Sequence, residues 1–203
     1  MKNTCCAQNM RWALLLIFAA MGAGCGSAGH MEQTWTEDVQ LEGGSKMIVL
    51  ERHVDLELTS AWGGGAGNAV ETRSVLRIQG ERMMPDWDYP LKPLVLYRDA
   101  ATKEWVIVAS TNSCELWHER GSPPGRYFEF RSGGGWWKPV DLASASIGRK
   151  ANLLYGLADG KLPKHITLEE KRARQSAPDE PKSYQSIDIE AGKGCTPAAR
   201  EAQ

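Results

Sequence analysis

Apolar and polar side chains alternate along two stretches in the first half of the chain. In residues 46–58 apolar side chains at even-numbered positions alternate with Glu51, His53, Asp55 and Glu57, and residues 69–79 show a similar alternation. The apolar positions of the two stretches are Ile48, Leu50, Val54, Leu56, Leu58, Val70, Leu76 and Ile78. A period of two is typical of a half-buried antiparallel strand. Because a glycine-rich loop at residues 60–68 separates the stretches, the sequence predicts a wide β-hairpin.

Shorter apolar and aromatic runs follow between residues 91 and 140. They cover residues 94–98, 104–110, 114–119, 127–131 and 136–140, and turn-forming residues separate them. Such spacing predicts successive β-hairpins, and Pro139 predicts that the last strand lies at a sheet edge or a bulge. With a further strand at residues 34–41, we expect a mainly β fold. It is an antiparallel sandwich or curled meander of about eight strands, with short C-terminal helices.

The pattern changes after residue 140. Residues 142–149 predict a short helix. Thr167 and Glu170 have the spacing of a capping box, which predicts a surface helix that ends near Gln175. The chain from residue 176 onward is rich in proline and charge, so it is expected to be a loosely ordered tail. These boundaries define a β-rich domain at residues 34–175 and a tail at residues 176–203.

The N-terminus has the pattern of an export signal. Arg11 precedes an apolar run at residues 12–21 that is too short to span a bilayer, and small residues lead from there to Cys25. This segment resembles the lipobox of bacterial lipoprotein precursors, in which the signal is cut before a cysteine that carries the lipid. The resemblance implies a signal peptide at residues 1–24 and lipidation of Cys25. Met10 offers a second start. Gly22 stands where the lipobox favours leucine, so a plain secretory signal cut elsewhere is the alternative.

The same resemblance implies where the mature protein lies. Gly26 takes the place of the aspartate that is associated with inner-membrane retention, which favours an outer-membrane lipoprotein facing the periplasm. Residues 25–33 would then form a short tether. Export leaves Cys114 and Cys195 as the mature pair in an oxidising compartment, which predicts one disulfide that pins the tail to the strand holding Cys114. A free thiol or an intermolecular bridge is the alternative.

Composition and charge argue against several functions. The chain is 42% hydrophobic and 24% charged with a net charge of −1, which gives no electrostatic reason to expect a nucleic acid. His30, His53, His118 and His165 have no second histidine or cysteine at ligand spacing, so no metal is expected. The glycines of residues 63–67 lack the lysine of a phosphate-binding loop, and no cofactor is expected.

Carboxylates and tryptophans remain as candidate functional residues. Asp86 and Asp88 flank an aromatic residue, and together with Glu129 they are the carboxylates that a polysaccharide hydrolase would use. Nearby prolines favour a solvated loop instead. An exposed tryptophan can stack on a sugar ring or a partner protein. Adjacent tryptophans in a strand point to opposite faces, so one of residues 136 and 137 is expected at the surface. The candidate ligand or partner contacts are Trp62, Trp87, Trp136 and Trp137.

Several short motifs lie in the body of the chain. They are Trp-Thr-Glu at residues 35–37, Met-Ile-Val at residues 47–49, and Tyr-Phe-Glu-Phe-Arg at residues 127–131 with Trp137 and Val140. By these motifs the body resembles a family of uncharacterised proteobacterial proteins, many of them predicted lipoproteins. The family has no activity that could be carried over. The expected function is a non-enzymatic envelope lipoprotein, held at the membrane by its lipid, that binds an envelope protein or glycan. The alternative is a hydrolase acting on envelope polysaccharide.

Overall fold

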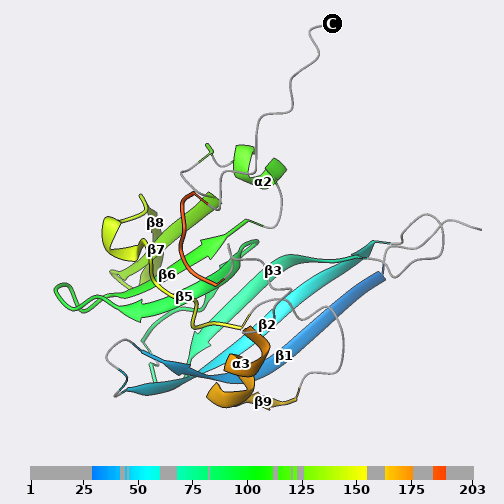
Figure 1. The fold of residues 1–203 in the computed structure, drawn as a ribbon, viewed down its shortest axis with the longest axis horizontal. Coiled ribbons are helices and arrows are strands. Elements are labelled where there is room, and N and C mark those ends of the chain that lie inside the picture. Colours follow the sequence, from blue (N-terminus) through cyan, green and yellow to red (C-terminus); the bar gives the residue numbers. More distant parts are fainter. Residues whose placement is uncertain are drawn as a thin grey trace, which may run out of the picture.

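The computed structural model describes residues 29–41, 44, 46–59, 68–81, 83–111, 114–119, 121–122, 126–154, 163–175 and 185–190. Within these ranges the chain forms nine strands in two sheets, one of five strands and one of four, with two short α-helices. Figure 1 shows the two sheets as separate layers, with the C-terminal helix packed beside the first strand. The predicted mainly β fold of two sheets is confirmed.

The five-stranded sheet is built on the two alternating stretches. Its order is β4-β3-β2-β1-β9, formed by β4 (Trp87–Tyr89), β3 (Asn68–Ile78), β2 (Met47–Thr59), β1 (Gly29–Gln40) and β9 (His165–Ile166). Strands β2 and β3 pair antiparallel from Leu50 opposite Ile78 onward, so the predicted wide hairpin is confirmed. A register shift between Asp55 and Leu56 interrupts this pairing. Strand β9 pairs parallel with β1, which the sequence pattern did not predict.

The four-stranded sheet is an antiparallel meander. It contains β5 (Lys92–Arg98), β6 (Trp105–Ser110), β7 (Tyr127–Gly133) and β8 (Trp136–Val140) in sequence order. The two-residue loop between β7 and β8 has φ values of 64° at Gly134 and 83° at Gly135. Two-residue hairpin loops of type I′ need positive φ at both residues, which explains the glycines. Strand β8 is an edge strand, so the position predicted for Pro139 is confirmed.

The main core lies between the facing sides of the two sheets. Val39, Leu50 and Leu76 of the five-stranded sheet pack in one cluster with Ile107 and Phe130 of the other. A second cluster covers the opposite face of the four-stranded sheet. Segments outside the sheet cover the strands in that cluster. The side chains that these segments contribute include Leu142, Ala151, Ile187 and Ile189. Both faces of the four-stranded sheet are therefore buried, which explains why all six residues of β6 are buried.

Three boundaries differ from the sequence prediction. Strand β1 begins at Gly29, so the last residues of the expected tether belong to the sheet. Residues 114–119 form helix α2 (Cys114–Glu119) and not a strand, so a disulfide at Cys114 would hold the tail to a helix. The helix expected at residues 142–149 is only a short 3-10 turn, Ser144–Ser146.

Part of the expected tail is an ordered piece of the domain. Ile187 is fully buried, and residues Lys150 and Ser186 form an antiparallel bridge. The prediction of a tail outside the domain is therefore wrong for this segment, because Ile187 and Ile189 pack into the second cluster. None of the helices in the described ranges is long and apolar enough to cross a membrane.

Candidate binding cleft

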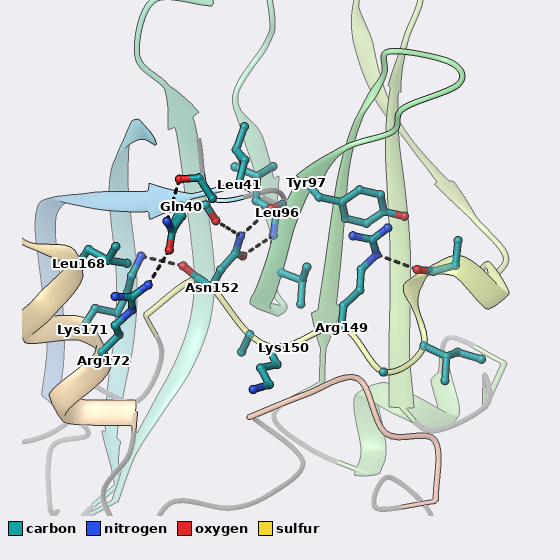
Figure 2. Close-up of a pocket in the computed structure, with 16 residues that line it drawn as sticks. Gln40, Leu41, Leu96, Tyr97, Arg149, Lys150, Asn152, Leu168, Lys171 and Arg172 are labelled. Carbon is teal, nitrogen blue, oxygen red and sulfur yellow. Dashed lines mark hydrogen bonds between the residues drawn. The ribbon is translucent and has the colours of Figure 1, made fainter. Parts of the chain in front are cut away.

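A cleft of about 700 Å³ opens where the two sheets meet the C-terminal helix α3 (Leu168–Gln175). Its walls come from the end of β1, from β5, from residues 145–152 and from α3, and Figure 2 shows these segments converging. Clefts of this volume are typical of sites that enclose a small ligand or a short segment of a larger one. The side chains labelled in Figure 2 are Gln40, Leu41, Leu96, Tyr97, Arg149, Lys150, Asn152, Leu168, Lys171 and Arg172.

Asn152 joins the two sheets at the floor of the cleft. Its Nδ2 donates to the carbonyl oxygens of Leu96 at 2.8 Å and Gln40 at 3.2 Å, and its Oδ1 accepts from the Leu96 backbone N–H at 2.8 Å. One side chain thus satisfies backbone groups of β5 and of the end of β1. Because these partners lie far from Asn152 in the sequence, no local pattern could have revealed this contact.

Helix α3 forms the wall opposite β5. The predicted capping box is confirmed: the Glu170 N–H donates to Thr167 Oγ1 at 3.3 Å, and the Thr167 N–H donates to Glu170 Oε2 at 2.9 Å. The hydrogen bonds that the Thr167 N–H and Thr167 Oγ1 donate to the Glu170 carboxylate lower the pKa of Glu170. The helix also carries a buried cation that sequence reasoning placed at the surface, since Lys171 is only 1% exposed.

A buried group of charges holds α3 against the five-stranded sheet. Glu37 is fully buried, and its Oε2 accepts from Lys171 Nζ and from the Leu154 N–H, both at 2.9 Å. Its Oε1 accepts from Arg52 Nη1 at 2.9 Å. Lys171 Nζ also donates to the carbonyl oxygens of Asn152, at 2.7 Å, and Asp38. Burial lowers the pKa of Lys171, and the neighbouring Glu37 carboxylate opposes that shift.

The sequence did contain a signal for these buried charges. Glu37 lies between Trp35 and Val39 on the strand face that packs inward, and Arg52 lies between Leu50 and Val54 on the inward face of β2. A charge at an apolar position of a period-two pattern is buried unless the register shifts. Because a buried charge must be paired, a carboxylate and a guanidinium in this phase on adjacent strands predict an ion pair.

The lining of the cleft is strongly basic. Arg149, Lys150, Lys171 and Arg172 line it, and no acidic side chain belongs to the described lining. Arg149 lies over the Tyr97 ring at 3.7 Å, and its Nε donates to the carbonyl oxygen of Ala145 at 2.7 Å. Arg172 Nη2 donates to Gln40 Oε1 at 2.6 Å. This acceptor is a neutral amide oxygen. Among the described residues, no carboxylate forms an ion pair with Lys150 or Arg172.

The tryptophans proposed as contacts have different surroundings. Trp136 is 61% exposed and Trp137 is 8% exposed, so the expectation that one of the two reaches the surface is met by Trp136. Trp137 Nε1 donates to the carbonyl oxygen of Pro85 at 3.0 Å. Trp87 is fully buried in the main core, edge-on to Phe130. Proposing Trp87 and Trp137 as ligand contacts was therefore wrong, because both pack in the core. Trp62 lies outside the described residues.

The carboxylates suggested for hydrolysis do not form a pair. Asp88 is bound by Arg73 through both carboxylate oxygens, at 2.8 and 2.5 Å, and Arg77 binds Asp86 in the same way at 2.9 and 2.7 Å. The hydrogen bond from Arg73 lowers the pKa of Asp88, which is the wrong direction for a general acid. Glu129 is fully buried elsewhere, where it accepts from Ser146 Oγ at 2.6 Å.

Two predicted modifications involve residues that the structure does not describe. Cys114 is the first residue of α2, but Cys195 lies outside the described ranges, so the disulfide stays a prediction. Cys25 also lies outside them, and its lipidation likewise stays a prediction. Comparison with known proteins found no match to a family model, to a curated protein or to a solved structure.

Proposed function

We propose that this protein is a non-enzymatic lipoprotein of the bacterial cell envelope, and that its cleft binds a segment of an anionic envelope glycan. The observation that carries the proposal is the lining, in which Arg149, Lys150 and Arg172 are basic and no described side chain is acidic, while a fourth cation, Lys171, is buried and paired with Glu37. A carboxylate or phosphate group on the ligand would find charge-assisted hydrogen-bond donors there. The lipid on Cys25 would hold the domain at the membrane, and a disulfide between Cys114 and Cys195 would hold its tail.

The size and polarity of the cleft favour a glycan over a protein partner. Stable protein interfaces bury roughly 800 Å² on each partner, and they are broad surfaces. This site is instead an open cleft of about 700 Å³ in which the amide of Gln40 lies beside apolar side chains such as Leu41. Amide groups, cations and apolar patches together suit a sugar with an acidic substituent.

The direction of β1 places the cleft far from the proposed anchor. The strand has 12 residues from Gly29 to Gln40, and Gln40 lines the cleft. At about 3.3 Å per residue the two ends are roughly 35–40 Å apart. Since Gly29 lies only four positions after Cys25, the cleft would lie at the end of β1 that is farther along the chain from the lipid. This arrangement suits a polymer outside the headgroup layer.

A binding measurement with charge-reversed variants tests the proposal. We expect the mature protein in detergent to bind oligogalacturonate, a carboxylated glycan probe, and to bind it more weakly as ionic strength rises. Lys150→Glu and Arg172→Glu should each weaken binding by roughly tenfold, which corresponds to about 1.4 kcal/mol. Lys138→Glu on β8 and Arg174→Glu on α3 are matched controls, because both residues are exposed and lie outside the cleft lining.

The same protein allows the membrane part of the proposal to be tested separately. A radiolabelled fatty acid should mark the wild-type protein in cells and leave Cys25→Ala unlabelled. Equal labelling of the two proteins would refute lipidation without affecting the cleft. Conversely, equal binding by Lys150→Glu, Arg172→Glu and the two controls would refute the cleft as the glycan site, whatever the labelling shows.

A further inference from the structure

A second group of polar side chains lies on the outward face of β1 and β2, at the end nearest the N-terminus. His30 and Glu32 are alternate residues of β1 and share this face, and Asp55 of β2 is directly opposite Glu32 in the strand register. One ligand-type atom from each of the three residues lies within 4.8 Å of the other two. No sequence spacing indicated this group, because Glu32 and Asp55 lie far apart in the chain.

The spacing within this group fits a shared metal ion better than direct hydrogen bonds. His30 Nε2 and Glu32 Oε1 are 3.6 Å apart, which is too long for a good hydrogen bond. Zinc holds histidine nitrogen and carboxylate oxygen at about 2.0–2.2 Å, and the corners of such a tetrahedron are about 3.4 Å apart. The side chains of His30 and Glu32 are 57% and 63% exposed, so small rotations would close the remaining gap to Asp55.

The third proposed ligand, Asp55, is held in place by His53. His53 Nε2 lies 2.9 Å from Asp55 Oδ1, and the other ring nitrogen of His53 lies 3.0 Å from Thr34 Oγ1. Hydrogen bonds of this kind fix the orientation of metal-binding side chains. The register shift between β2 and β3 also falls at Asp55, whose carbonyl oxygen accepts from Thr72 Oγ1 at 3.1 Å. Such irregularities re-aim a side chain and are common next to functional sites.

The charges around the group leave room for a divalent cation. Arg73 Nη1 is 3.6 Å from Asp55 Oδ2, but Arg73 directs its two closest hydrogen bonds to Asp88. The three ligands bring two carboxylates and one imidazole. A single guanidinium that is mainly engaged with another carboxylate leaves this set with a negative balance when both acids are ionised.

We propose that His30, Glu32 and Asp55 bind Zn²⁺, with His53 acting as the residue that positions Asp55. An imidazole beside carboxylates favours zinc over calcium and magnesium, which prefer oxygen ligands alone. Three protein ligands on an exposed sheet face leave the fourth position to water or to a group from a partner. The site is independent of the cleft, and it does not depend on the proposed glycan.

Equilibrium dialysis of the untagged mature protein, stripped of metal with a chelator, tests the site. We expect one Zn²⁺ per chain, no displacement by excess Mg²⁺, and an increase in the melting temperature on adding zinc. His30→Ala should weaken zinc binding by more than tenfold, and His53→Ala by roughly ten- to a hundredfold. His118→Ala is the matched control, because this exposed histidine lies on α2 and should leave the affinity unchanged.

Because His30 is exposed, its replacement should leave the far-ultraviolet circular dichroism spectrum unchanged, so that a loss of zinc binding reports on ligation. The proposal is overturned if wild-type protein takes up no zinc at about 100 µM, a concentration that would detect even weak sites. It is equally overturned if His30→Ala binds zinc as tightly as His118→Ala does.

Discussion

Replacing Glu37 by glutamine tests whether the buried charges hold α3 to the five-stranded sheet. Both carboxylate oxygens of Glu37 accept hydrogen bonds: Oε1 from Arg52, and Oε2 from Lys171 and from the Leu154 N–H. Glutamine keeps the shape but has one oxygen and one NH₂ group. Whichever way the amide is turned, its NH₂ faces a donor. The change therefore removes the negative charge and also creates an unavoidable donor–donor contact.

The expected loss of stability is large because the partners stay buried. Arg52 is 2% exposed and Lys171 is 1% exposed, so removing the charge of Glu37 leaves two cations with little access to water. Breaking a buried ion pair in this way costs about 3–5 kcal/mol. For a domain of this size each kcal/mol lowers the melting temperature by about 2–4 °C, so we expect a fall of roughly 6–20 °C.

Urea unfolding followed by tryptophan fluorescence measures this loss. The matched control is Asp38→Asn on the same strand, because Asp38 is 23% exposed and lies 3.4 Å from the exposed His165. That change should cost less than about 1 kcal/mol. Adding Lys171→Met to Glu37→Gln should recover part of the loss, since it removes one stranded cation. Equal costs for Glu37→Gln and Asp38→Asn would refute the reasoning.

Three other expectations, two about substitutions and one about the disulfide, can be checked by unfolding or by peptide mapping. Trp87→Ala should lower the unfolding free energy by about 3–5 kcal/mol in urea, whereas exposed Trp136→Ala should stay within about 0.5 kcal/mol; similar losses would contradict the core assignment. Backbone N–H groups of the following turn lower the pKa of Asp99 from 3.8 to about 2. The ionised Asp99 carboxylate therefore stabilises the fold above pH 3.8, and this contribution is lost as the pH falls through 2. Asp99→Asn should accordingly flatten the acid limb of the pH–stability curve, and an unchanged limb would refute this. Non-reducing peptide mapping should find Cys114 joined to Cys195, and free thiols at both positions would end that prediction.

The sheets were predictable because their strands leave a local record in the sequence. Alternation at residues 46–58 and 69–79 gave the wide hairpin directly, and Pro139 gave an edge strand. Residues 114–119 were misread because six residues are too few to separate a helical period from an apolar strand. The parallel strand β9 has only two residues, His165 and Ile166, so it leaves no periodic pattern at all.

The cleft was less predictable because its parts meet only in three dimensions. Gln40, Asn152 and Arg172 come from distant segments, and the hydrogen bonds between them follow no sequence spacing. The proposed zinc ligands also come from distant positions of the sequence, and the pairing of β1 with β2 brings them together. The buried ion pair is different. Glu37 and Arg52 occupy positions on adjacent strands where the alternating pattern expects an apolar residue. Charged residues at such positions predict a buried ion pair.

The buried charges also explain how the cleft keeps its shape. Lys171 and Arg172 are consecutive on α3, and they point to different partners on β1: Lys171 to Glu37, and Arg172 to Gln40. An apolar side chain at position 171 would still be buried, but it would allow the helix to slide along the sheet. Lys171 Nζ has three acceptors, namely Glu37 Oε2 and the carbonyl oxygens of Asp38 and Asn152. All three are satisfied at only one position of α3 along the sheet.

Fixing α3 in that position fixes the side chains on its neighbouring face. Arg172 then reaches Gln40 at the rim, and Asn152 accepts from Lys171 through its carbonyl while its amide ties β5 to β1. In some proteins a buried polar contact contributes more to a unique arrangement than to net stability. In this protein the arrangement that it selects is the one that places a basic wall opposite β5. The charge hidden behind the cleft therefore determines where the charge exposed within it lies.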